Sequence, residues 1–67
     1  MPVQYRFLML NPAMRVVQDI TLLCLRDADA LVIAEGIAGV NSVEVWDNRR
    51  LVGFVQSAEE RRAVRAA

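Results

Sequence analysis

The sequence predicts an α+β domain in which two β-hairpins are joined by one helix and followed by a short C-terminal helix. Two observations predict this fold. Apolar residues alternate at a period of two in four segments separated by turn-forming residues, and a segment with a period near 3.6 lies between the second and the third. At 67 residues the chain has room for one domain, which we place at residues 1–56, with a helical tail at 57–67.

The first predicted hairpin joins strands at residues 3–10 and 15–23 through a loop at residues 11–14. Pro12 favours a turn here because proline has no backbone N–H and restricts the residue before it. This loop length gives one largely apolar face, and on the other face it sets Arg6 opposite Asp19. The other predicted partners are Val3 with Leu22, Tyr5 with Ile20, Phe7 with Gln18, Met9 with Val16, Leu8 with Val17, and Gln4 with Thr21.

The next segment is predicted to form a helix from Ala28 to about Ala38. We expect Asp27 to cap the N-terminus and Gly39 to end the helix with a positive φ. The helical period gathers alanine, leucine and isoleucine on one broad side and leaves Val32 on the opposite side. The segment is short and contains an internal glycine, so the helix depends on packing against the sheet.

The second predicted hairpin joins strands at residues 42–47 and 50–55 around Asn48-Arg49. Asparagine suits a positive φ and arginine is a poorer second residue, so a longer loop with a bulge stays open as an alternative. With a two-residue loop, the predicted pairs are Asp47 with Arg50, Val45 with Val52 and Val43 with Phe54, while Trp46 lies beside Leu51 and Glu44 beside Gly53 on the opposite face.

The segment after the second hairpin, Ser57 to Glu60, has the capping-box pattern that begins a helix, predicted from Ala58 to about Ala66. Short connections and the handedness of crossovers favour the strand order 2-1-3-4, with 1-2-3-4 as the alternative. One helix then covers one sheet face.

Residue types that build catalytic or metal sites are scarce. The chain has no histidine, and its single cysteine, Cys24, lies in an apolar run and is interpreted as a buried thiol. Neighbouring carboxylates are explained by helix capping, helix dipoles and cross-strand pairing. We therefore predict no enzymatic activity, no catalytic residue, no metal ion and no cofactor.

Eight basic and eight acidic residues cancel, so no global field attracts nucleic acid or an anionic membrane. Weak binding of nucleic acid through arginines is kept as an alternative, the candidates being Arg49, Arg50, Arg61, Arg62 and Arg65. No apolar run approaches the ~20 residues that cross a bilayer, and the N-terminal segment lacks a signal-peptide pattern. We expect a cytoplasmic protein.

Three parts of the sequence resemble a group of uncharacterised short bacterial proteins. They are Tyr5-Arg6-Phe7, Asp27-Ala28-Asp29-Ala30-Leu31, and Val43-Glu44-Val45-Trp46-Asp47 with Arg50-Leu51-Val52. The likeness spans residues 5 to 55 and implies a fold, without an activity, a cofactor or a catalytic residue. Members often have glycine in both hairpin turns, where this chain has Pro12-Ala13 and Asn48-Arg49.

The leading functional hypothesis is a small interaction module that forms a homodimer through the sheet face that the helix does not cover. A 55% hydrophobic content is high for a chain this short, so some apolar area must face outward. The candidate interface residues are Leu8, Leu10, Val17, Trp46 and Leu51, with Val32 on the helix as a competing site.

Two alternatives stay open. In the first, the tail helix covers the same sheet face within one chain. In the second, the protein is a small-ligand-binding or enzymatic domain with a pocket between helix and sheet, lined by Tyr5, Gln18 and Cys24. An unidentified protein partner also remains compatible with the sequence.

Overall fold

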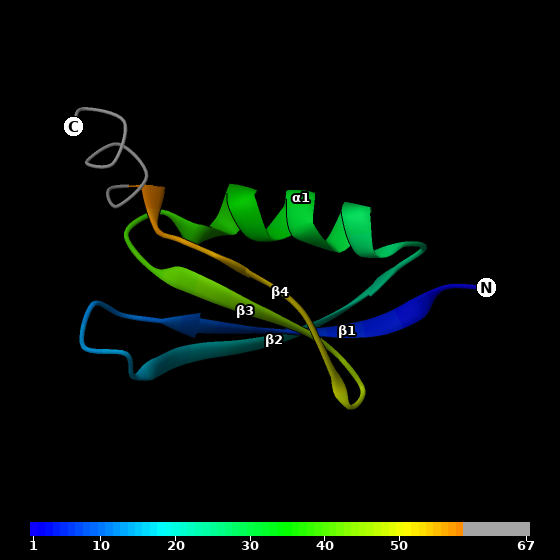
Figure 1. Cartoon of the computed structure of the whole chain (residues 1–67), viewed down its shortest axis with the longest axis horizontal. Coiled ribbons are helices and arrows are strands. Elements are labelled where there is room, and N and C mark those ends of the chain that lie inside the picture. The colour runs from blue at the N-terminus through cyan, green and yellow to red at the C-terminus, as the bar shows by residue number, and fades with distance from the viewer. Residues whose placement is uncertain (59–67) are drawn as a thin grey trace.

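The computed structural model describes residues 1–58, and within them the chain forms a four-stranded antiparallel sheet with one helix against one face (Figure 1). The elements are β1 Val3–Leu10, β2 Val16–Cys24, α1 Asp27–Ala38, β3 Ser42–Asp47 and β4 Arg50–Val55. The strand order is β2-β1-β3-β4, which confirms the predicted ββαββ arrangement and the favoured order. The predicted C-terminal helix lies almost wholly in residues 59–67, outside the described residues.

The β1–β2 register differs by two residues from the predicted one, because Phe7 pairs with Ile20 and not with Gln18. One residue of the difference comes from the turn. Asn11 N donates to Arg15 O at 2.9 Å and Met14 N to Asn11 O at 2.7 Å, so the loop has three residues and ends on Met14 at φ 63°. The second comes from a bulge that sets both Val16 and Val17 across from Leu10.

All of the predicted β1–β2 pairs are therefore wrong in detail. The structure pairs Val3 with Cys24, Gln4 with Leu23, Tyr5 with Leu22, Arg6 with Thr21, Leu8 with Asp19 and Met9 with Gln18. A shift of two residues keeps the odd-numbered residues of β1 on the helix side, because side chains alternate with a period of two. The apolar face was consequently predicted correctly although the partners were not.

The second hairpin has the predicted two-residue loop, with Asp47 opposite Arg50 and Asn48 at φ 49°. Beyond it, β4 contains a bulge at Val52, so that Trp46 pairs with Leu51 while Val45 pairs with Gly53. The predicted pairs of Val45 with Val52, Val43 with Phe54 and Glu44 with Gly53 are wrong for this reason. Val43 instead pairs with Val55, and Glu44 pairs with Phe54.

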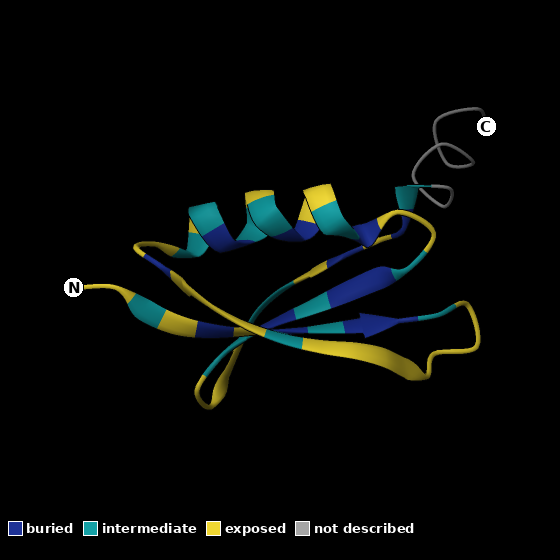
Figure 2. Ribbon diagram, turned by 180° about the vertical axis from the view of Figure 1, so that it is seen from behind, coloured by how far each residue is buried: buried dark blue, intermediate teal, exposed yellow. Residues whose placement is uncertain are grey.

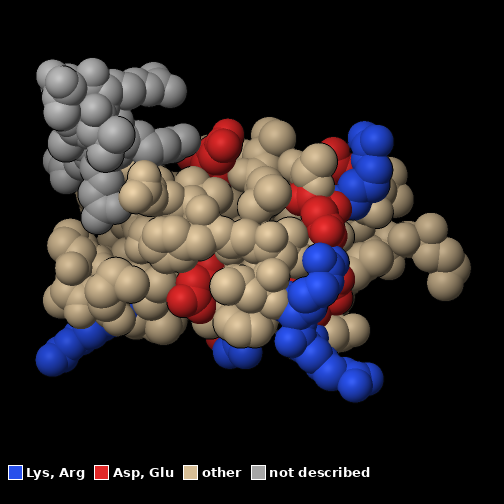
Figure 3. Space-filling model, in the orientation of Figure 1, with Lys and Arg blue, Asp and Glu red and all other residues tan. Residues whose placement is uncertain are grey.

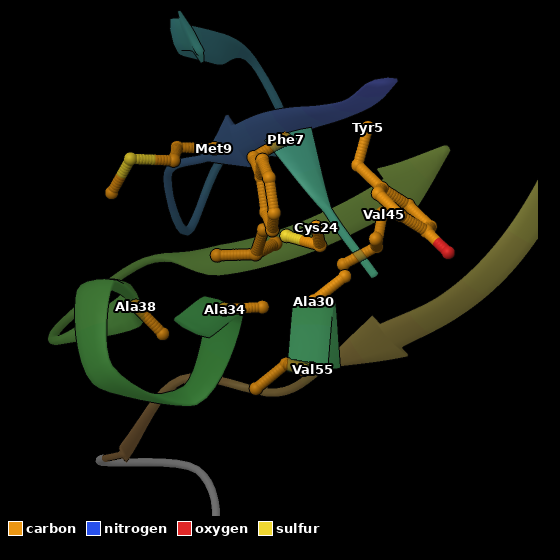
Figure 4. Packing of buried hydrophobic residues seen from close by; sticks show 10 residues of the cluster. Tyr5, Phe7, Met9, Cys24, Ala30, Ala34, Ala38, Val45 and Val55 are labelled. Carbon is orange, nitrogen blue, oxygen red and sulfur yellow. The ribbon is translucent and has the colours of Figure 1, made fainter. Parts of the chain in front are cut away.

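The helix packs on the sheet through a stripe of small residues, Ala30, Ala34 and Ala38, which are all buried. Figure 4 shows side chains of the sheet, Phe7 among them, pointing toward this stripe. Gly53 lets the helix approach β4, since a Cβ atom there would lie 2.8 Å from Leu31 Cδ2. The core therefore combines large residues on the strands with small residues on the helix.

Of the two predicted helix caps, the structure shows the C-terminal one and not the N-terminal one. Gly39 has a φ of 56° and ends the helix, as predicted. The predicted cap at Asp27 is wrong: the N-cap is Arg26, no side chain caps the helix, and Asp27 is its first residue. The Asp27 carboxylate is engaged elsewhere, by Tyr5 and Arg50.

The helix packs mainly over β3 and β4 and only lightly over β1 and β2. As a result β2 is exposed along nearly its whole length, and Cys24 is the one buried residue in it (Figure 2). The sheet thus has a covered half and an open half.

Candidate interaction surface

The sheet face opposite α1 carries a contiguous apolar patch. Leu8 pairs with Glu44, which pairs with Phe54, and in the next row Arg6 pairs with Trp46, which pairs with Leu51. We call the four apolar residues of these two rows the outer patch, namely Leu8, Trp46, Leu51 and Phe54. Leu51 and Phe54 are 48% and 46% exposed, whereas Leu8 and Trp46 are half-buried.

The candidate interface residues lie in different environments. Val17 is 52% exposed near the start of β2, and Leu51 belongs to the outer patch. Leu10 is buried, so it supports the sheet and offers no accessible area. Val32 is 67% exposed on the helix, on the side that faces away from the sheet.

Phe54 was assigned to the covered face in the predicted pairing, because the bulge at Val52 was not placed. The sequence did hold a signal for it. Gly53 interrupts an otherwise apolar strand, and a glycine inside a strand often marks a bulge. Placing the bulge beside Gly53 sets Phe54 opposite Glu44 and adds the largest exposed side chain to the patch.

Two charged groups on this face, Arg6 and Asp19, form an ion pair within the chain. Arg6 Nε lies 3.0 Å from both carboxylate oxygens of Asp19, and Arg6 Nη2 donates to Oδ2 at 2.6 Å. The contact is diagonal, since Arg6 is directly opposite Thr21. The hydrogen bond from Arg6 lowers the pKa of Asp19, and the carboxylate raises the pKa of Arg6. Trp46 Nε1 donates to Glu44 Oε1 at 3.0 Å.

Two shallow cavities flank Arg6. One of about 320 Å³ is lined by Arg6, Leu8, Trp46 and Asn48. The other, of about 220 Å³, is lined by Gln4, Tyr5, Arg6, Thr21 and Asn48. The larger cavity is lined by two of the four outer-patch residues, Leu8 and Trp46. This part of the face is therefore concave and able to receive a protruding side chain.

A second polar cluster joins four elements, β1, α1, β3 and β4, at the opposite end of the sheet from the first turn. Tyr5 Oη donates to Asp27 Oδ1 at 2.7 Å. Arg50 Nη2 donates to Asp27 Oδ2 at 3.1 Å and to Asp47 Oδ2 at 2.8 Å. The Tyr5 hydroxyl and then Arg50 lower the pKa of Asp27, and the bond to Asp27 followed by burial raises the pKa of Tyr5 to about 12. We call the four residues of this cluster the clasp, namely Tyr5, Asp27, Asp47 and Arg50.

The three residues of the alternative ligand pocket do not converge. Tyr5 and Cys24 are buried in the core, whereas Gln18 is exposed on β2 and pairs with Met9. Cys24 is buried, which confirms the prediction, and burial raises the pKa of its thiol. Across residues 1–58 there is no cluster of three side chains able to hold a metal ion.

Of the arginines proposed to contact phosphates, Arg50 is held by Asp27 and Asp47, and Arg49 is exposed at the turn. Arg61, Arg62 and Arg65 lie outside the described residues. Figure 3 shows basic and acidic side chains next to each other and a largely uncharged remainder on the face in view. On that face the arginines therefore lie among carboxylates.

Comparisons with family models, with curated proteins and with solved structures find no match to this chain. No helix in the described part of the chain is long and apolar enough to span a bilayer.

Proposed function

We propose that this protein is a small, non-enzymatic interaction module that self-associates by packing the outer patches of two copies against each other. The observation that carries the proposal is the outer patch itself, in which Trp46, Leu51 and Phe54 lie together on the face that α1 leaves open. Contiguous apolar surface of this kind marks interaction sites, and tryptophan is a favoured anchor in them.

The chemistry of the face suits a second copy of the same chain. Burying a charge is costly unless it is paired, and Arg6 and Asp19 already neutralise each other. The face also carries Glu44, so a two-fold arrangement allows Arg6 of one copy to approach Glu44 of the other. Two sheets packed face to face would bury the patch from both sides.

The size of the domain supports the same conclusion. A core built from about 60 residues rarely stabilises a fold by more than ~3 to 5 kcal/mol, and small domains are often helped by disulfides, metals or association. One cysteine cannot form an internal disulfide, and the described residues hold no metal cluster. Association is the remaining source of stability.

Light scattering over a range of protein concentrations tests the proposal, with Trp46→Asp as the diagnostic variant and Val32→Asp as its matched control. Wild type should assemble, Trp46→Asp should lower the assembly mass, and Val32→Asp should leave it unchanged. If Val32→Asp disrupts the assembly and Trp46→Asp does not, helices form the interface. If wild type is a monomer at every concentration, self-association fails, and cover by the chain's own tail becomes the better explanation.

A further inference from the structure

The strand β2 forms an unusually open edge of the sheet. It has nine residues, and between Val16 and Leu23 every residue except the half-buried Ile20 is exposed (Figure 2). Natural edge strands are protected by short length, lysine, proline or an inward-pointing charge. Beyond the bulge at its start, β2 uses none of these, and Asp19, its only charged residue, is neutralised by Arg6.

The other edge of the sheet, β4, is protected. It has six residues, contains the bulge at Val52 and begins with Arg50, which is held by two carboxylates. Bulges twist an edge and interrupt its hydrogen-bonding groups. Only β2 therefore offers a regular edge, and a contact that uses the same edge of both copies closes as a dimer instead of growing.

The register identifies which backbone groups of β2 are free. Asn11 donates to Arg15, and backbone groups alternate in direction along a strand, so the odd-numbered residues of β1 bond toward β2. Their partners are Gln18, Ile20, Leu22 and Cys24. The N–H and C=O groups of Asp19, Thr21 and Leu23 consequently point away from the sheet, toward the open edge.

We propose that β2 pairs antiparallel with β2 of a second copy about a two-fold axis at Ile20, joining two sheets into one. This inference rests on the proposed function, self-association, and adds a second contact to it. In this register Val17 faces the partner copy's Leu23, Asp19 faces its Thr21, and Ile20 faces the partner copy's Ile20. Apolar residues meet apolar residues, and each carboxylate meets a hydroxyl.

The two neighbouring registers are less favourable. An axis at Asp19 sets the two Asp19 carboxylates directly opposite each other, and like charges in that position are destabilising. An axis at Thr21 sets Asp19 against Leu23, which removes solvent from a carboxylate without giving it a partner. The sequence of β2 is thus self-complementary about Ile20.

The edge contact and the outer patch use different surfaces, the β2 edge and the open face of the sheet. Each contact is then separable by mutation. Trp46→Asp should leave edge-linked dimers, and an edge variant should leave dimers linked through the outer patch.

Thr21→Pro is the edge variant, because it removes an N–H that points away from β1 and leaves the hydrogen bonds between β1 and β2 in place. Thr21→Ala is the matched control, since it removes the hydroxyl and keeps the N–H. Sedimentation with circular dichroism as a folding check should show edge association weakened roughly tenfold or more by Thr21→Pro. Thr21→Ala should have a much smaller effect.

A cysteine on the axis provides an independent test that does not depend on Thr21→Pro folding. In a Cys24→Ala background, the Ile20→Cys residues of two copies should form a disulfide on mild oxidation. They are directly opposite each other in a non-hydrogen-bonded pair, where the two Cα atoms are ~4.5 Å apart. Thr21→Cys should not form a disulfide, since the two copies of residue 21 lie diagonally, beyond disulfide reach.

The outcomes separate the two proposals. If Thr21→Pro leaves the mass unchanged and Ile20→Cys fails to cross-link while Trp46→Asp lowers the mass, the edge contact is overturned and the proposed function stands. If wild type is monomeric at every concentration, both are overturned. If Trp46→Asp, which retains only the edge contact, forms species that grow without limit, the closed edge dimer is overturned.

Discussion

At the scale of single residues, Met14 holds the backbone in a conformation that its side chain disfavours. It ends the first turn at φ 63°, a region where glycine has no steric cost and where this kind of turn usually places glycine. Met14 is also 61% exposed, so its side chain gains little from packing. Hydrogen bonds of Asn11 with Met14 and Arg15 therefore hold the turn, although its conformation is unfavourable for a methionine at position 14.

We expect Met14→Gly to stabilise the fold by about 1 kcal/mol, because it removes the left-handed strain at the cost of some entropy in the unfolded chain. The urea midpoint should rise. Ala13→Gly is the control: Ala13 has no positive φ, so the same replacement should lower the midpoint. A lower midpoint for Met14→Gly would show that the methionine side chain contributes more than its exposure suggests.

Tyr5 makes the fold sensitive to high pH. Its pKa is raised to about 12, first by the bond to Asp27 and then by burial, whereas an unfolded tyrosine titrates near 10. The folded state thus favours the protonated hydroxyl, and this stabilisation is complete below pH ~10 and lost as the pH rises toward 12. The raised pKa of Cys24 acts in the same direction.

Tyr5→Phe should lower the urea midpoint at pH 8 and reduce the further loss of stability between pH ~10 and 12. Cys24→Ala separates the contribution of the thiol. Native-state absorbance of the phenolate should rise only near pH 12 in wild type, and a normal titration near 10 would contradict the clasp. Asp27 affects stability at the acid end of the pH range. Its pKa is lowered in the folded state, so its stabilisation is present above pH ~4 and lost as the pH falls below that value.

At the scale of secondary-structure elements, the approach of α1 to β4 depends on Gly53. We expect Gly53→Ala to destabilise by about 1 kcal/mol or more, because the new methyl group meets Leu31 Cδ2 at 2.8 Å and overpacks the contact. Combining it with Leu31→Ala should cost less than the sum of the two single changes in a double-mutant cycle.

Gly36→Ala is the matched control for the helix. No atom lies within 4 Å of a Cβ there, so the replacement should stabilise by ~0.5 to 1 kcal/mol through helix propensity alone. Chemical denaturation measures both glycine variants on the same scale. Equal and favourable effects at the two positions would mean that Leu31 moves aside freely.

The elements themselves were predictable from the sequence, and their register was not. The period of two located β1, β3 and β4 at the bounds that the structure shows, and glycine located the end of α1. The register depends on one-residue events, the turn ending on Met14 and the bulges at Val17 and Val52, which periodicity does not show. Of these, the bulge at Val52 alone has a local signal, the glycine at position 53. The outer patch was predicted in part for the same reason: Trp46 and Leu51 follow from alternation, while Phe54 requires the second bulge.

The prediction that Asp27 caps the helix is wrong because tertiary contacts engage its carboxylate. Capping is a local rule, and an aspartate beside a helix start satisfies it. In the structure a buried hydroxyl from β1 and a guanidinium from β4 bind the carboxylate instead, and both partners are more than 20 positions away in sequence.

At the scale of the whole molecule, self-association should appear in thermal unfolding. A contact made only by folded copies stabilises them by mass action, so the Tm of wild type should rise with protein concentration. The double variant Trp46→Asp with Thr21→Pro lacks both contacts and should melt at a Tm that does not depend on concentration. A concentration-independent Tm for wild type would count against any assembly at these concentrations.

The position of β1 in the middle of the sheet also dictates when the chain can fold during synthesis. The first strand of this sheet to be made, β1, needs partners on both sides, and the second of them, β3, ends 37 residues after β1 does, at Asp47 compared with Leu10. Until then the nascent β1–β2 hairpin has no third strand, and α1, which packs only lightly over β1 and β2, leaves most of its apolar face uncovered. Isolated hairpins are marginal in water. The domain therefore forms its sheet only after β3 has been made, and a chain truncated after Asn41 should remain as sensitive to proteases as an unfolded one.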